Sequence, residues 1–266
     1  RLAPSNLSRA VYSASSERSI GLGTMGWHSY LQSKMIPFEG DGFNSAVHHT
    51  RFLFKKIKER AVEESRRLAK IRGEAPDCAG SGMRNAHLLA IAPNASSSSI
   101  IGTSPSIEPW NANAFTSQGR AGAFLIKNKY LERLLEEKGK NTQEVWKSIV
   151  LNEGSVQHLD FLTEHEKAVF KTAYEIAPEW IVMQAAERQK YVCQSMSLNI
   201  FVDDNMTAQR MSDLHITGWL KGLKTFYYCR SKPATRAKLG DGGEKPLNSI
   251  QPKIEIKETE CLACEG

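Results

Sequence analysis

The amino-acid sequence predicts an α/β fold, because two kinds of segment alternate along the chain. Short apolar runs that end at a proline or a glycine are typical of buried strands, and residues 87–92, which stop before Pro93, form the clearest one. Longer segments, such as residues 44–71, carry apolar residues at helical spacing with charged residues between them. Strands that alternate with helices favour an architecture in which helices pack on a mostly parallel sheet.

Further elements follow from local patterns. Thr163 and Glu166 form a capping box, so a helix is expected to begin there and to run to about residue 176. Residues 1–17 are expected to be a connector, and residues 110–124 are expected to be irregular. Residues 125–138 are expected to be the end of a strand followed by a helix. The other expected helices cover residues 141–151, 179–190 and 207–223, and the other expected strands cover residues 197–202 and 224–229. In the last helix, Trp219 is expected on the buried side.

The composition fits a packed protein with an anionic ligand. The chain of 266 residues contains 41% hydrophobic residues, which is enough for a core, and 24% charged residues. Its net charge of +6 suits ligands such as nucleotides, although charge alone would also fit weak nucleic-acid binding. The sequence contains no nucleic-acid motif and no alternation of aromatic with basic residues, so no nucleic-acid partner is expected.

The chain carries no signal for a membrane or for secretion. No apolar run approaches the length of a membrane span, and the polar start does not resemble a signal peptide. The five cysteines, an odd number at irregular spacing, argue against a secreted disulfide framework. We therefore expect a cytoplasmic protein in a reducing compartment. Because the first residue is arginine, we expect the chain to be processed or to be a piece of a longer one.

The strand at residues 87–92 leads into Asn94, Ala95 and a run of four serines, residues 96–99. Such a turn can bind an anion if a helix follows, because the first amides of a helix have no internal partner and the helix dipole adds positive potential. The serine hydroxyls would add further donors. An N-cap turn inside a polar loop explains the same residues equally well from spacing alone.

This region resembles the large subunit of class I ribonucleotide reductase. The resemblance rests on RNAHLLAIAP, TSPSIEPWNANAF and GAFLIKNKYL, and it continues in RSIGLG, YVCQSMSLN and GLKTFYY. It implies that the turn after the strand holds the diphosphate of a ribonucleotide substrate. The residues of this phosphate cradle would be Asn94, Ala95, Ser96, Ser97 and Ser98.

The resemblance covers about residues 16–228, and it implies the family fold, which is a ten-stranded α/β barrel. This chain would form the C-terminal part of that barrel, so residues 1–229 are expected to belong to the barrel domain. After Arg230, lysine, glycine, proline and aspartate dominate, which is typical of a flexible segment. Residues 230–266 are therefore expected to form a flexible redox tail.

Tyr227 and Tyr228 lie at the end of the last expected strand. Neighbours in a strand point to opposite faces, so the pattern alone predicts one buried ring and one exposed ring. The resemblance implies another role, because the family segment GLKTxxYY carries two stacked tyrosines that pass a radical from the small subunit to the active-site cysteine. Tyrosine suits this role because its phenol can lose an electron and a proton together.

Cys261 and Cys264 form a CxxC pair, which can be half of a zinc site or a redox dithiol. The sequence offers no second Cys/His pair with matching spacing, so no metal site is expected. The resemblance implies a shuttle in which this pair reduces the active-site disulfide after each turnover, and thioredoxin or glutaredoxin then reduces the pair. A flexible tether would raise the effective concentration of the pair at the active site.

The resemblance thus implies a portion of a ribonucleoside-diphosphate reductase, which replaces the ribose 2′-hydroxyl by hydrogen and supplies deoxyribonucleotides for DNA replication. The radical cysteine of the family, its neighbouring asparagine and glutamate, and its disulfide cysteines have no counterpart in this sequence. We therefore expect the chain to need an N-terminal large-subunit portion. The radical would come from a metal-containing small subunit, and this chain would hold no cofactor. The alternative is a non-catalytic assembly or nucleotide-binding fragment.

Overall fold

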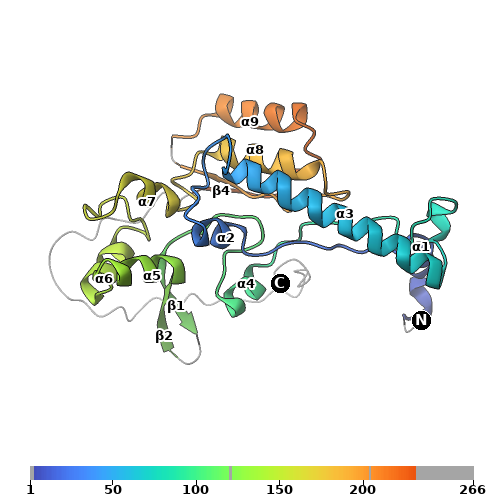
Figure 1. Cartoon of the computed structure of the whole chain (residues 1–266), viewed down its shortest axis with the longest axis horizontal. Helices are drawn as coiled ribbons and strands as arrows, with labels where there is room; N and C mark the ends of the chain where they lie inside the picture. The colour runs from blue at the N-terminus through green and yellow to red at the C-terminus, as the bar shows by residue number, and fades with distance from the viewer. Residues whose placement is uncertain (1–2, 120–121, 204, 232–266) are drawn as a thin grey trace, which may run out of the picture.

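The computed structural model of the chain describes residues 3–119, 122–203 and 205–231. Figure 1 shows an elongated arrangement in which three helices lie along one face, namely α3 (Ala46–Arg72), α8 (Pro178–Gln189) and α9 (Ala208–Leu220). A smaller group of helices and a β-hairpin lies at one end (Figure 1). Among the described residues, no helix combines the length and the apolar character that crossing a membrane requires.

Parallel extended segments run beneath the three helices. Leu22 forms a parallel bridge with Leu89, and Ile91 forms one with Met196, so three of the segments lie side by side. The amide of Ser197 donates to the carbonyl of Ile91 at 2.9 Å. In the part of the chain that is described, these parallel segments cover residues 20–22, 87–91, 194–202 and 227–231.

The last two segments pair through β3 (Ile200–Val202) and β4 (Cys229–Ser231), which are also parallel. Each segment is joined to the next through a helix, since α3, α8 and α9 each lie between two consecutive segments in the chain. Parallel pairing requires such crossovers. The result is an arc of parallel strands with helices outside, as expected for part of an α/β barrel. Neither outer edge of this arc pairs with another described segment, and the count of ten strands stays a prediction.

The larger core lies between the arc and its helices. It contains side chains of the extended segments and of α8, among them Leu89, Ile91, Met196, Leu198, Val182 and Ala185. Alternation along a strand places every second side chain on the opposite face. Because Met196 and Leu198 point into this core, Ser197 and Asn199 point to the inner face of the arc. Polar groups on that inner face build the site.

A second core joins the helices and the hairpin at the end of the molecule. It packs α5 (Lys129–Glu137), α6 (Gln143–Leu151) and α7 (Glu164–Val169) against the antiparallel pair β1 (Ala114–Gly119) and β2 (Gly122–Lys127). The predicted capping box is confirmed, because Thr163 and Glu166 cap each other's backbone amides. The remaining helical elements are η1 (Ser5–Leu7), α1 (Ser8–Glu17), α2 (Trp27–Ser33), η2 (Pro76–Cys78) and α4 (Ala95–Ile101).

Several sequence-based boundaries are wrong. Residues 1–17 were expected to be a connector, but most of them form η1 and α1, and α1 contacts η2. Helix α7 ends at Val169 rather than near residue 176, because the backbone beyond it pairs with residues 110–113. In that pairing, the carbonyl of Phe170 accepts from the side chain of Asn113 at 2.7 Å. The same stretch of residues 110–124 contains β1, where irregular structure was expected.

Candidate functional site

The serine turn lies at the carboxyl end of the segment at residues 87–91, where Asn94 becomes the N-cap of α4. The side chain of Asn94 does not cap the helix. Its Oδ1 accepts instead from the amide of Ser106 at 2.6 Å. The first amides of a helix have no partner within the helix, so the amides at residues 95–97 remain able to bind an anion.

The three serines of the predicted cradle differ in their surroundings. Ser96 and Ser97 are exposed, and neither hydroxyl bonds to the described part of the chain. Ser98 is buried, with 2% of its surface exposed, and its hydroxyl donates to the carbonyl of Ala95 at 2.6 Å. The hydroxyl proton of Ser98 therefore stabilises the turn. The exposed hydroxyls of Ser96 and Ser97 and the amides at residues 95–97 are the groups of the turn that are able to donate to a ligand.

Helix α2 holds the loop that follows α4. The amide of Gly26 donates to the carbonyl of Ser104 at 3.0 Å, and the amide of Trp27 donates to Ser106 at 3.2 Å. Gly26 has a left-handed φ of 80°, and a Cβ at this position would collide with the side chain of Thr103. The turn therefore requires glycine at position 26, both for its conformation and for the close approach.

Tyr227 and Tyr228 lie at the end of the arc, in its last described segment. Their ring centroids are 4.1 Å apart, with an angle of 50° between the planes. The two residues are 45% and 48% exposed, so the alternation of one buried and one exposed ring is not observed. The amide of Tyr227 donates to the carbonyl of Leu198 at 2.9 Å, which holds this segment beside its neighbour in the arc. At these exposures both rings are accessible.

A buried carboxyl group, which sequence reasoning did not single out, lies beside the tyrosine pair. Glu108 is 8% exposed, and its Oε1 accepts from Asn199 Nδ2 at 2.6 Å. Oδ1 of the same asparagine accepts from the amide of Tyr228 at 3.2 Å. Burial raises the pKa of Glu108 to about 7, although Arg230 and the bond from Asn199 both favour the charged form.

One loop, residues 104–110, connects the serine turn to the tyrosine pair. Ser106 bonds to Asn94 at the serine turn, and Glu108, two residues later, bonds to Asn199 beside Tyr228. The predicted phosphate cradle and the predicted radical relay therefore belong to one hydrogen-bonded framework. The only sequence signal for this link is that Glu108 stands between Ile107 and Pro109, an apolar setting that is unusual for an exposed carboxylate.

The cysteines fall into two groups. Cys261 and Cys264 lie outside the described residues. So does the tail expected at residues 230–266, apart from its first two residues, which belong to β4. Burial raises the pKa of Cys193, but hydrogen bonds from two backbone amides, together with the charge of Lys58 and the residue's own backbone, lower its pKa overall. These amides belong to Leu88 and Leu89, at 3.1 and 3.2 Å from Sγ, so Cys193 joins two neighbouring segments of the arc. Among the described residues, no three His, Cys, Asp or Glu side chains gather into a possible metal site.

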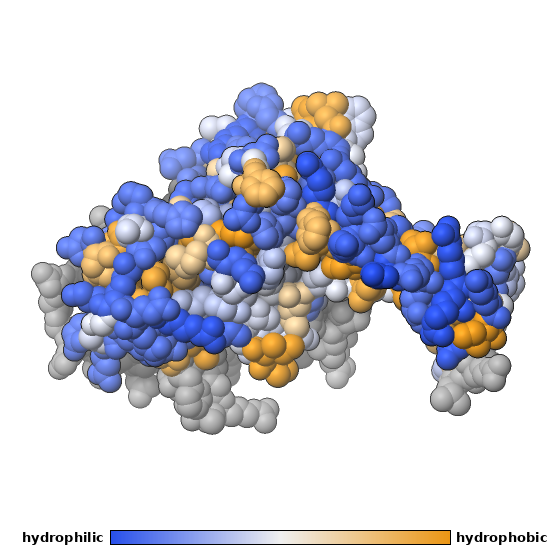
Figure 2. Space-filling model, in the orientation of Figure 1, coloured by the Kyte–Doolittle hydropathy of each residue, from blue (hydrophilic) through white to orange (hydrophobic). Residues whose placement is uncertain are grey.

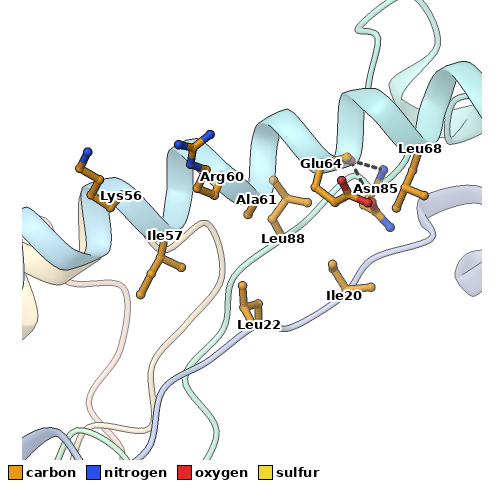
Figure 3. A pocket seen from close by; sticks show the side chains of 11 residues that line it. Ile20, Leu22, Lys56, Ile57, Arg60, Ala61, Glu64, Leu68, Asn85 and Leu88 are labelled. Atoms are coloured by element: carbon orange, nitrogen blue, oxygen red, sulfur yellow. Dashed lines mark hydrogen bonds between the residues drawn. The ribbon is translucent and has the colours of Figure 1, made fainter. Parts of the chain in front are cut away.

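An apolar groove of about 460 Å³ lies between α3 and the first two extended segments (Figure 3). Ile57 and Leu68 from α3 line it opposite Leu88 and Leu22 (Figure 3). Figure 2 shows hydrophilic groups along α3 and apolar groups gathered below it. None of the predicted site residues lines this groove, which follows the open edge of the arc.

Comparison with known proteins gives a consistent result. Residues 2–81 and 76–229 match the family model described as the barrel domain of ribonucleotide reductase. A putative ribonucleoside-diphosphate reductase large subunit of Frog virus 3 is 47% identical over 97% of this chain and 44% of the relative. The ribonucleoside-diphosphate reductase large subunit of Invertebrate iridescent virus 3 is 44% identical over 99% of this chain and 41% of the relative.

A solved structure is similar as well. The class Id ribonucleotide reductase alpha subunit of Actinobacillus ureae superposes with a TM-score of 0.79 and 43% sequence identity. The match covers 87% of this chain and 42% of that one. The chain thus spans less than half the length of each of these relatives.

Proposed function

The chain belongs to the ribonucleotide reductase family through its barrel domain, and on this premise we propose that it is the C-terminal portion of a ribonucleoside-diphosphate reductase large subunit. The reaction is replacement of the ribose 2′-hydroxyl of a ribonucleoside diphosphate by hydrogen, with thiols as the reductant. The supporting observation is the single framework that joins an uncapped serine turn to a pair of tyrosine rings.

Each part of the framework has a role in this proposal. The amides at residues 95–97 and the hydroxyls of Ser96 and Ser97 bind the substrate diphosphate. Asn94 keeps its side chain away from those amides, so the anion meets free donors. Ser98 closes the turn from within. Tyr227 and Tyr228 pass the radical inward from a small subunit, whose metal centre generates it.

The remaining partners follow from the same proposal. Cys261 and Cys264 reduce the active-site disulfide, and thioredoxin or glutaredoxin reduces them in a cytoplasmic, reducing compartment. An N-terminal large-subunit portion supplies the radical cysteine. The apolar groove and the two unpaired edges of the described arc support such a partner, because a parallel sheet is ordinarily covered and closed by further chain.

The same groove and edges favour a second candidate, which is a non-catalytic assembly fragment that only completes a barrel with another chain. The two candidates differ at the serine turn. A fragment that only assembles has no need of free amides or exposed hydroxyls at residues 95–97, whereas a reductase portion needs them for its substrate.

The test is substrate affinity in the complex reconstituted with the N-terminal portion and the small subunit. Replacing both Ser96 and Ser97 by alanine should weaken nucleoside diphosphate binding, because each hydrogen bond lost to a charged group costs roughly 1.5–3 kcal/mol, or roughly 10- to 150-fold in affinity. Folding should be unaffected, since both side chains are exposed.

Ser99→Ala is the matched control. Ser99 is also exposed, but its hydroxyl donates to the carbonyl of Ala95 at 3.1 Å, so it does not point at the anion. Affinity in this variant should stay close to that of the unmodified protein. An unchanged dissociation constant in the Ser96/Ser97 double variant would remove the phosphate assignment and favour the assembly fragment.

A further inference from the structure

Glu108 is held in one orientation by its surroundings. It lies in the loop between Ile107 and Pro109, and only 8% of its surface is exposed. The bond from Asn199 Nδ2 to its Oε1 measures 2.6 Å, which is short for an N–H···O bond. A carboxyl group this deeply buried needs such a donor, because an unpaired polar group in the interior is costly.

The orientation of the Asn199 amide follows from its partners. The backbone amide of Tyr228 can only donate, so it must meet the oxygen of Asn199, at 3.2 Å. The nitrogen of Asn199 then faces Glu108, which accepts from it. Asn199 is 3% exposed, so water offers neither atom another partner. Glu108 thereby fixes Asn199, and Asn199 fixes the backbone of Tyr228.

Arg230 adds a positive charge to this group. It lies two residues beyond Tyr228 in the same extended segment, hence on the same face, and its guanidinium is 5.6 Å from the centroid of that ring. Arg230 also acts electrostatically on Glu108 and favours the carboxylate. Burial acts in the opposite direction and dominates, so the pKa of Glu108 is about 7. The carboxyl group of Glu108 therefore changes charge near neutral pH.

We propose that Glu108 is a positioning residue for the tyrosine pair. It fixes the backbone of Tyr228 through Asn199, and its carboxyl group contributes together with Arg230 to the electrostatic potential at both rings. The meaning of this potential for radical transfer rests on the proposed function, since the charge beside a phenol affects how readily it gives up an electron. The coupling itself is a property of this chain and needs no substrate or partner.

The test reads the potential at the rings directly. A 4-trifluoromethylphenylalanine reporter replaces Tyr227, because its ring cannot titrate and leaves the contact between Arg230 and Tyr228 in place. Its ¹⁹F chemical shift is followed from about pH 5 to about pH 9. The imidazole of His215 packs on Phe226 at 4.6 Å, so all variants are made in a His215→Gln background to remove its contribution.

The expected result is a single titration step with a midpoint near pH 7. Glu108→Gln keeps an oxygen that can accept from Asn199 but cannot ionise, so the step should disappear. Arg230→Gln changes an exposed side chain and should move the midpoint to higher pH, because it removes the charge that favours the carboxylate. Circular dichroism is used to check that each variant is folded.

The proposal is overturned if no step appears near neutral pH or if the step persists in Glu108→Gln. It is also overturned if Arg230→Gln leaves the midpoint unchanged, and this variant decides the matter should Glu108→Gln not fold. These outcomes are independent of the reductase assignment, which the affinity of the serine turn tests. A chain without reductase function would still give the titration step, and a reductase could lack it.

Discussion

A buried histidine should make the stability of this protein depend on pH. His28 in α2 is fully buried, and its Nδ1 accepts from the amide of Trp110 at 2.9 Å. A ring nitrogen that accepts from an N–H group cannot carry a proton, so the folded protein holds the neutral ring. Burial lowers the pKa of His28 to about 3, against the opposing effect of a hydrogen bond to the backbone of Val169.

The direction and the size of the change in stability with pH follow from the linkage between proton binding at His28 and folding. The ordinary pKa of a histidine is 6.5, so between pH 6.5 and about pH 3 the unfolded chain binds one more proton than the folded chain at this site. The contribution of His28 to stability is therefore greatest above pH 6.5 and falls as the pH decreases, with a slope approaching about 1.4 kcal/mol per pH unit. At about pH 5 the loss attributable to His28 amounts to about 2 kcal/mol.

The assay is urea unfolding at about pH 7 and about pH 5 for the unmodified chain and for His28→Gln, whose amide oxygen can accept from Trp110 without titrating. The free energy of unfolding should fall by about 2 kcal/mol more in the unmodified chain. His165→Gln, which changes an exposed histidine, is the control and should keep the full dependence. Equal pH dependence in the unmodified chain and in His28→Gln would refute the reasoning.

Two further predictions concern the proposed reductase, reconstituted with its N-terminal portion and small subunit. Tyr227→Phe and Tyr228→Phe each keep a half-exposed ring and remove its hydroxyl. Thermal stability should therefore hardly shift, whereas turnover should collapse. Near-normal turnover would return both residues to a structural role. Replacing Cys261 and Cys264 by serine should abolish thioredoxin-driven turnover but leave most dithiothreitol-driven turnover, and unchanged thioredoxin-driven turnover would contradict the shuttle.

Elements with strong local signals could be predicted from the sequence. Helix α3 was expected over residues 44–71 and spans Ala46–Arg72, because its apolar stripe and a closing glycine are both local. Helix α8 begins at Pro178, since proline suits a first helical turn. The capping box at Thr163 was also correct. In each of these cases the chain needs only its immediate neighbours to determine the structure.

Elements whose structure depends on strand pairing or tertiary packing could not be predicted in this way. The hairpin strand β1 lies in a polar stretch and is formed by pairing with β2, not by an apolar pattern. Trp219 was expected on the buried side of α9 but is 73% exposed. Its helix packs through Leu214 and Gly218 instead, and Phe226 occupies the space beside Gly218. Helical spacing alone could not distinguish these two faces, because both carry apolar residues.

The candidate site shows the same limit. The serine turn and the tyrosine pair were found because their motifs are contiguous in the sequence, although their roles remain proposals. The bond between Glu108 and Asn199 joins residues that are 91 positions apart, so no local pattern indicates it. The sequence also could not show that the serines differ in exposure, since only the fold buries Ser98 and leaves Ser96 exposed.

The loop at residues 104–110 is the element through which these separate features act together. Its first part is fixed to α2, where Ser104 and Ser29 exchange backbone and hydroxyl hydrogen bonds, and its last part is fixed by the bond from Trp110 to His28. Pro105 and Pro109 restrict the backbone between these anchors. A loop held at both ends transmits a disturbance at α2 to the groups it carries. Loss of the hydrogen bond between Trp110 and His28 should therefore disturb the position of Glu108, which precedes Trp110 by two residues in the loop.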